Sequence, residues 1–203
     1  MILVILASSI SVAQIDSLKK IYLSGAMADP RAPGSFYDYW KEGYTISTGA
    51  YFNFYSGLDF RASLEYSSFA FSQERLFQKL KVDEHDVTME GATTSIGTIS
   101  GNIIWTLYEY AASAKRPRVY ILGGAGIQFS NIATSTINYP LAPASQARKL
   151  NVVPCLQIGC GLTGSLTRTT DWIVECDYLY GLTSSQIVNT DYRTVHVGIA
   201  ITP

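Results

Sequence analysis

The sequence has few charged residues for its length. Asp, Glu, Lys and Arg make up 15% of its 203 residues, whereas about a quarter of a typical soluble chain is charged. The formal net charge of −1 leaves no basic surface of the kind that nucleic-acid-binding domains need, so we expect no nucleic-acid partner. A soluble domain with so few charges would have low solubility, whereas a chain whose outer surface lies in lipid would not. The composition therefore favours a membrane protein.

Long apolar runs are also missing. Outside the N-terminus, no stretch approaches the roughly 18 consecutive apolar residues that mark a membrane-spanning helix, so the sequence excludes a helical membrane protein. The segment Met1–Ile10 is apolar or small, and Ser-Val-Ala at 11–13 fits a small-x-small cleavage site before Gln14. We therefore predict a signal peptide over residues 1–13, with a buried strand as the alternative, and one mature domain over residues 14–203.

Strand patterns dominate the rest of the chain, and no segment has a convincing helical period. The eight segments that we predict as strands are 20–28, 43–54, 58–72, 94–110, 118–131, 151–165, 172–183 and 192–202. They are longer than the strands of soluble proteins, which usually have about five or six residues. They suit the tilted strands of a membrane barrel, which need about 9–11 residues to cross the hydrocarbon layer.

The connections between these segments alternate in length. The longer ones are 29–42, 73–93, 132–150 and 184–191, and the shorter ones are 55–57, 111–117 and 166–171. Outer-membrane barrels have short periplasmic turns and longer outer loops. With the N-terminus in the periplasm, every longer connection falls on the outer side. The alternation therefore predicts an up-and-down arrangement of antiparallel strands.

The two faces of each predicted strand differ in chemistry. Along segment 58–72, Leu58 and Leu64 share one face, and Arg61 and Glu65 share the other. The polar faces hold mainly Ser, Thr, Gly and Asn, and the lysines lie at strand ends or in connections. A soluble, lipocalin-like barrel is the alternative, but its exterior would carry many Lys and Glu. We therefore predict an all-β, eight-stranded antiparallel up-and-down transmembrane β-barrel whose apolar faces meet lipid.

Aromatic residues gather near both ends of the predicted strands, where an amphipathic ring has an apolar and a wet neighbour. We predict an aromatic girdle at the two membrane interfaces, formed by Phe54, Tyr55, Tyr108, Tyr110 and Trp172 at the periplasmic end and by Tyr66, Phe129, Tyr178, Tyr180 and Tyr192 at the outer end. The alternative is that strands simply favour aromatic residues. That alternative explains the number of aromatic residues, but it explains their clustering near the strand ends less well.

Three features of the chain together resemble a known family. They are the short apolar leader, the aromatic segment Tyr37–Tyr44 leading into Gly49–Phe52, and the strand through Leu64–Phe69. In these features the chain is similar to the small eight-stranded outer-membrane barrels of the OmpA/OmpX type, which are grouped as outer-membrane β-barrel domain proteins. The resemblance covers nearly the whole mature chain. It implies a location in the bacterial outer membrane and brings no catalytic motif.

The polar faces of the predicted strands also carry ionisable residues. We predict that they form a polar network in the lumen, with the members Asp59, Arg61, Glu65, Glu175, Asp177 and His196. Arg61 and Glu175 fall at a similar height above the periplasmic end, and buried charges are tolerated only when they are paired. Such a network would largely plug the lumen. The alternative is the acid–base site of an outer-membrane lipid-modifying enzyme, but no nucleophile motif of the G-x-S-x-G kind is present.

Cysteine and histidine are scarce, and their spacing matches no metal-binding motif. Cys160 and Cys176 fall opposite each other in a hairpin centred near Arg168. In an oxidising compartment they could form a cross-strand disulfide; the alternative is a pair of lipid-facing thiols that behave as small apolar groups. The glycine-rich stretch 123–126 lies within a strand and precedes no helix, so it is not a nucleotide-binding loop. We predict no metal, no cofactor and no catalytic residue.

The hypotheses for function follow from this architecture. The leading one is a monomeric outer-membrane barrel with a structural or surface-interaction role, in contact with outer-membrane lipid and lipopolysaccharide. Loops 73–93 and 132–150 would bind a surface ligand, since loops often carry binding functions on rigid scaffolds. The second hypothesis is a narrow porin-like channel, and the third is a lipid-modifying enzyme.

Overall fold

Eight long strands form most of the protein. In this computed structural model the described residues are 18–31, 36–80, 88–89, 93–108, 117–132, 136–138, 143–145, 149–182 and 190–203. The predicted signal peptide over residues 1–13 lies outside them. The long strands are β1 (Leu18–Pro30), β2 (Trp40–Tyr55), β3 (Leu58–Phe71), β5 (Thr93–Tyr108), β6 (Arg118–Ile132), β9 (Lys149–Ser165), β10 (Thr170–Gly181) and β11 (Tyr192–Ile201).

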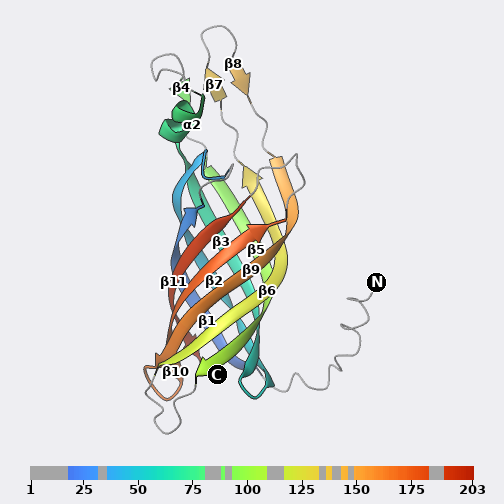
Figure 1. Cartoon of the computed structure of the whole chain (residues 1–203), viewed down its shortest axis with the longest axis vertical. Coiled ribbons are helices and arrows are strands. Elements are labelled where there is room, and N and C mark those ends of the chain that lie inside the picture. The colour runs from blue at the N-terminus through green and yellow to red at the C-terminus, as the bar shows by residue number, and fades with distance from the viewer. Residues whose placement is uncertain are drawn as a thin grey trace, which may run out of the picture.

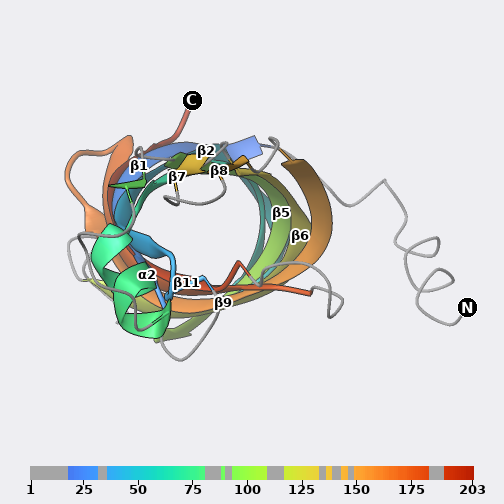
Figure 2. The ribbon, with the colours of Figure 1, turned by 90° about the horizontal axis from the view of Figure 1, so that it is seen from above.

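These strands close into an antiparallel barrel in the order β1-β11-β10-β9-β6-β5-β3-β2 (Figure 1). The first and last strands pair from Ile21 opposite Ile201 to Pro30 opposite Tyr192, and this closure removes the free sheet edges. Seen along its axis, the sheet forms a complete ring (Figure 2). The predicted fold class is confirmed. Both ends of each predicted strand lie within three residues of the corresponding ends of an observed strand.

Alternate residues along each strand point to opposite sides of the barrel wall. In β11, the side chains of Val195, Val197 and Ile199 are exposed, whereas Thr194 and His196 are buried. Val197 is 64% exposed although it lies in the middle of the strand. Apolar residues thus face outward and polar residues face the lumen, which is the reverse of a soluble barrel. This is the arrangement of a transmembrane barrel.

Short turns join the strands at the end of the barrel where the C-terminus lies (Figure 1). Ser56 and Gly57 join β2 to β3, and Gly57 has a φ of 78°, a left-handed conformation that glycine adopts at little cost. Between β9 and β10, the Thr167 hydroxyl accepts hydrogen bonds from the backbone N–H groups of Thr169 (3.2 Å) and Thr170 (3.0 Å). These turns coincide with predicted short connections, so this is the periplasmic end.

The outer end carries structure beyond the barrel (Figure 1). Helix α2 (Gln73–Leu80) follows β3, and a separate sheet contains β4 (Thr88–Met89), β7 (Thr136–Asn138) and β8 (Pro143–Ser145) in the order β4-β7-β8. The prediction of a chain without helix is wrong at α2. This helix has 8 residues, about two turns, and lies within the charge-rich segment 73–93 that was predicted as a connection. Among the described residues, no helix is both long and apolar enough to cross a membrane.

Arginine in place of Val197 tests which face of the wall meets lipid. Val197→Arg puts a guanidinium on the outer face at mid-strand, and we expect it to lower the free energy of unfolding by about 2–4 kcal/mol, the cost of arginine near the bilayer midplane. Urea unfolding of the protein in lipid vesicles measures the change. Leu166→Arg, in the exposed turn after β9, is the control and should cost less than about 1 kcal/mol. An unchanged stability for Val197→Arg would mean that this face does not contact lipid.

Candidate functional site

A buried ion pair bridges opposite walls of the barrel. Arg61 on β3 donates two hydrogen bonds to the Glu175 carboxylate on β10, with Nη1–Oε2 and Nη2–Oε1 distances of 2.7 and 2.9 Å. β3 and β10 are four strands apart in either direction around the ring, so this contact crosses the full width of the lumen. The two side chains are 3% and 4% exposed. We call Arg61 and Glu175 the lumen pair.

Three buried tyrosines surround the lumen pair. Tyr120 on β6 donates a hydrogen bond of 2.6 Å to Glu175 Oε2. The Arg61 guanidinium carbon lies 5.1 Å from the ring centroid of Tyr22 and 5.9 Å from that of Tyr51, within the range of cation–π contacts. The two charges are therefore paired, hydrogen-bonded and packed against aromatic rings. Burial in a low-dielectric interior is tolerated only under such conditions.

A belt of polar contacts runs along the wall near the lumen pair. Asn102 on β5 donates to Gln157 on β9, and Gln157 donates to Asp177 Oδ2 on β10, each at 3.0 Å. His196 on β11 has Nε2 3.6 Å from Asp177 Oδ2 and Nδ1 3.1 Å from the hydroxyl of Ser24 on β1. The structure thus brings Asp177 and His196 together, with partners from three further strands.

Glu65, another residue of the predicted lumen network, is held by hydroxyl groups. Tyr192 Oη donates to Glu65 Oε1 at 3.1 Å, and Ser67 Oγ lies 3.5 Å from the same oxygen. Tyr192 is fully buried, so its predicted place in the outer aromatic girdle is wrong. It has the same inward parity on β11 as Thr194 and His196. An aromatic ring at such an inward-facing position points into the lumen even where the strand lies at the height of the membrane interface.

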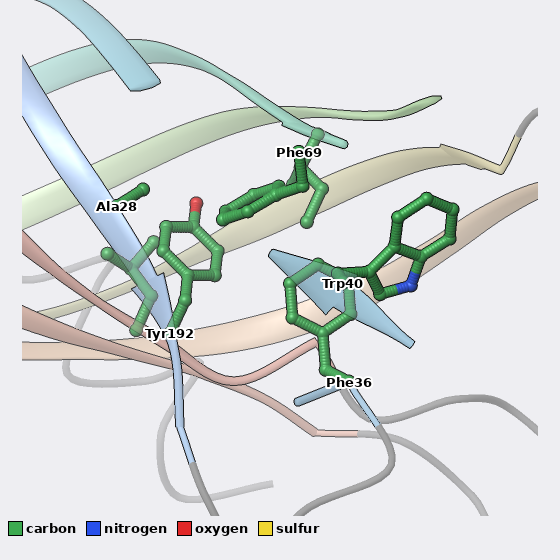
Figure 3. Packing of buried hydrophobic residues seen from close by; sticks show 7 residues of the cluster. Ala28, Phe36, Trp40, Phe69 and Tyr192 are labelled. Atoms are coloured by element: carbon green, nitrogen blue, oxygen red, sulfur yellow. The ribbon is translucent and has the colours of Figure 1, made fainter. Parts of the chain in front are cut away.

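Aromatic side chains pack together inside the outer end of the barrel (Figure 3). Phe36, from the turn between β1 and β2, meets Phe69 with ring centroids 4.9 Å apart, and Phe69 meets Tyr192 at 5.2 Å. We call this group the outer aromatic cluster; its members are Ala28, Phe36, Trp40, Phe69, Ile96, Leu179 and Tyr192. The cluster was not predicted, because a sequence pattern does not show which way a loop side chain such as Phe36 turns. The aromatic density of residues 36–44 is the signal that points to it.

Arg75 on α2 fastens the turn that carries Phe36. Its guanidinium carbon lies 4.1 Å from the ring centroid of Tyr37. The same group donates to the backbone carbonyls of Trp40 at 2.6 Å and Tyr37 at 3.3 Å, and to the Glu42 carboxylate at 2.9 Å. The turn over the lumen is therefore tied to the helix that follows β3.

Charged residues also surround the periplasmic mouth of the lumen. Lys19 pairs with Asp59 at 2.8 Å, while Asp171 binds both Lys20 and, at 3.1 Å, Arg118. These residues line a cavity of about 40 Å³, which holds only a few waters because each needs roughly 10–15 Å³. Asp59, predicted as part of the lumen network, thus lies at the mouth, with Lys19 as its partner.

Glycines on the lumen side make room for long polar side chains. A β-carbon on Gly161 would lie 2.4 Å from the Tyr120 hydroxyl oxygen, and one on Gly159 would lie 2.1 Å from an Asp177 carboxylate oxygen. On Gly123, which faces outward, a β-carbon would meet nothing within 4 Å. The inward glycines are therefore needed where a side chain from the neighbouring strand lies flat against the wall.

The other predicted girdle residues lie on the outside of the wall, as far as they are described. The exposed rings are Phe54, Tyr55, Tyr66, Phe129 and Tyr180, and the half-buried ones are Trp172 and Tyr178. The side chain of Tyr108 and the whole of Tyr110 lie outside the described residues.

The cysteines are free thiols. Cys160 on β9 and Cys176 on β10 are register partners, and both are exposed on the outer face. The structure thus places them opposite each other but contains no disulfide between them. In the described part of the chain, no three His, Cys, Asp or Glu side chains lie close enough together to hold a metal ion.

Comparison with known proteins finds likeness in structure but not in sequence. No family model and no curated protein matches the chain. Among solved structures, Neisserial surface protein A (NspA) has a TM-score of 0.56 at 12% identity, covering 91% of this chain and 96% of that chain. The attachment invasion locus protein Ail of Yersinia pestis, in complex with the heparin analogue sucrose octasulfate, has a TM-score of 0.46 at 13% identity, covering 90% and 96%. The N-terminal barrel domain of Pseudomonas aeruginosa OprF has a TM-score of 0.45 at 14% identity, covering 91% and 97%.

At such low identity, the likeness to NspA shows the fold alone. That fold is the small eight-stranded outer-membrane barrel, so the resemblance seen in the sequence is confirmed at the level of the fold. A closed barrel with an apolar outer wall and a charged lumen is built for the bacterial outer membrane, and the predicted location is confirmed with it.

Removing one member of the lumen pair should cost more stability than replacing both. Glu175→Gln leaves the Arg61 charge buried without its counter-ion, so we expect the free energy of unfolding to fall by about 3–5 kcal/mol. Arg61→Met combined with Glu175→Leu replaces both charges with apolar side chains and should restore most of that loss. Urea unfolding in lipid vesicles measures both variants. A double variant no more stable than Glu175→Gln would contradict the pairing of the two charges.

Adding one methyl group at Gly161 tests the crowding of the lumen. Gly161→Ala pushes against Tyr120 and weakens its bond to Glu175, so we expect a loss of about 1–3 kcal/mol, as for other overpacked interiors. Gly123→Ala makes the same chemical change on the outward face of β6, where space is open, and should leave the stability nearly unchanged. The same vesicle unfolding assay compares them. Equal effects at the two sites would contradict the packing described for Gly161.

Proposed function

We propose that the protein is a closed outer-membrane barrel that serves as a rigid scaffold for surface interactions through its outer loops. The proposal includes no catalytic step and no path for solutes through the lumen. The observation that carries it is the lumen pair, which joins two opposite walls in a barrel of eight strands. Further support comes from the outer aromatic cluster above the pair and the charged mouth below it.

The lumen pair supports a closed interior because of its width. The interior of an eight-stranded barrel is just wide enough for its own side chains to fill. Arg61 reaches the opposite wall, and Tyr22, Tyr51 and Tyr120 are buried around the contact with Glu175. A hydrated ion at this height would have to break a bidentate ion pair and displace buried rings.

The outer end supports a role in surface interaction. Arg75 ties the turn 36–39 to α2, and β4 pairs with β7, which links the connection after β3 to the connection after β6. The loops expected to bind a ligand, 73–93 and 132–150, lie only partly within the described residues, through α2, β4, β7 and β8. Where they are described, they are joined beyond the barrel (Figure 1), which offers a partner one combined surface.

A narrow channel is the second candidate, and the periplasmic mouth favours it. Lys19, Lys20 and Arg118 line a cavity there together with Asp59 and Asp171, so a small ion of either sign has charged groups to meet at this end. The inner lining of the cavity includes Tyr51 and Tyr120, the same rings that pack around the lumen pair. Any conduction would therefore depend on movement of that pair.

Planar bilayer recordings separate the two candidates. We expect the purified wild-type protein to give no single-channel events, with a known porin in the same membrane as the positive control. A variant in which residues 133–148 are replaced by Asn-Gly should be equally silent. Ile132 and Lys149 are already opposite each other in the β6–β9 ladder, so a two-residue turn can join them.

Each other result of these recordings contradicts part of the proposal. Regular single-channel events from the wild-type protein would overturn the closed scaffold and favour the channel. Events from the loop-replaced variant alone would show that the removed loop closes the lumen. Loss of heat-modifiable gel migration in that variant would mean that the loop serves folding and is not free for interaction.

A further inference from the structure

An apolar hollow opens on the lipid-facing wall over β5, β6, β9 and β10, with a volume of about 640 Å³. Gly123 lies in it, and Ile121, Ile158, Tyr178 and Tyr180 are among the side chains around it. The hollow exists because Gly123 has no side chain between longer neighbours; a β-carbon there would meet nothing within 4 Å. The wall therefore has a recess on the side that faces acyl chains.

Two arginines lie next to Tyr178, one of the residues that line this hollow. The Arg31 guanidinium carbon lies 5.1 Å from the ring centroid of Tyr178, which lines the hollow. Arg193 on β11 is the register partner of Tyr178, and its side chain is 62% exposed. Both arginines lie at the outer ends of their strands, since β1 ends at Pro30 and β11 begins at Tyr192. We expect the lipid headgroups at this height, where Tyr178 and Tyr180 belong to the predicted outer girdle. Tyr178 thus contacts the Arg31 guanidinium and also lines the apolar recess, while Arg193 lies beside it on the neighbouring strand.

Two carboxylates share this edge with the arginines. Asp29 pairs with Arg193, and both side chains of this pair are exposed. The Asp191 carboxylate accepts a backbone hydrogen bond of 3.2 Å, and burial raises its pKa while Arg31 acts in the opposite direction. Exposed ion pairs are weak, so Asp29 does not prevent Arg193 from binding a second anion.

We propose that this face binds an anionic, phosphate-bearing lipid of the outer leaflet, with its phosphate at Arg31 and Arg193 and one acyl chain in the hollow over Gly123. Guanidinium groups bind phosphate through charge-assisted hydrogen bonds. Tyrosine rings at the membrane interface contact both the headgroup and the chain. The site lies on the outer wall, so it goes beyond the closed-scaffold function and does not depend on it.

A second hollow provides an internal comparison. It has a volume of about 490 Å³ and lies over β1, β2, β3 and β5, with Ala62 and Leu64 in its lining. Its lining contains no aromatic residue on which a guanidinium could stack. An acyl chain there would have no headgroup contact of the kind that Tyr178 and Arg31 provide.

Native mass spectrometry of the purified protein in detergent micelles, titrated with diphosphoryl lipid A, tests the proposal. We expect the wild-type protein to retain one lipid molecule. Arg31→Gln combined with Arg193→Gln should weaken retention by about tenfold or more, the size expected for two charge-assisted hydrogen bonds. Gly123→Leu should also weaken retention, because the new side chain occupies the hollow.

Matched variants and lipids make the result specific. Arg168→Gln removes a guanidinium from the opposite end of the barrel, and Ala62→Leu fills the second hollow; both should retain the lipid as the wild type does. Lipid A without its phosphates should bind as weakly as diphosphoryl lipid A binds to the arginine variant. Heat-modifiable gel migration shows that each variant is folded.

Three outcomes would overturn the proposal. Undiminished retention by the arginine variant would show that Arg31 and Arg193 do not bind the headgroup. Undiminished retention by Gly123→Leu would show that the hollow does not hold an acyl chain. Displacement of lipid A by an equal concentration of inorganic phosphate would reduce the site to a simple anion site.

Discussion

A charge inside an eight-stranded barrel has to find its partner within the barrel, because the lumen is only as wide as the side chains that fill it. Arg61 and Glu175 meet this constraint by spanning the lumen from β3 to β10. This contact also determines which residues can surround it. Tyr120 donates a hydrogen bond to Glu175, and a side chain at position 161 would overlap the Tyr120 ring, so this position needs glycine. The outer face, in contrast, needs apolar side chains because it contacts lipid. Alternate residues of a strand point to opposite sides of the wall, so one strand can supply both faces.

The two ends of the lumen are built from different chemistry. At the periplasmic mouth, Lys19 and Asp171 belong to partly exposed ion pairs around a small cavity. At the outer end, Phe36 and its aromatic neighbours form an apolar group that Arg75 secures through the turn over it. A loop anchored in this way can present a defined surface to the outside, whereas the barrel wall below it contacts lipid. The arginines beside Tyr178 lie where these two environments meet.

Strand positions, closure and the direction of each face could be predicted from the sequence, because alternation acts on every residue of β11 and its neighbours. The pairing of Arg61 with Glu175 followed from their heights on inward faces. Tyr192 was misplaced because its height near the interface was weighed above its inward parity. The roles of Phe36 and Arg75 could not be predicted. Both residues lie in connections between barrel strands, and the path of a connection depends on tertiary contacts. The hollow over Gly123 could not be predicted either, because its lining depends on how four neighbouring strands are aligned with one another.

The most direct test of this account is whether acyl chains touch one face of β11 and not the other. Nuclear Overhauser contacts between lipid acyl protons and methyl groups, measured with the protein in a lipid nanodisc, report this without any substitution. We expect contacts to the methyl groups of Val197 and Ile199 and none to those of Thr194 and Ala200, whose side chains are buried in the lumen. Contacts to Thr194 and Ala200, with none to Val197 and Ile199, would contradict it.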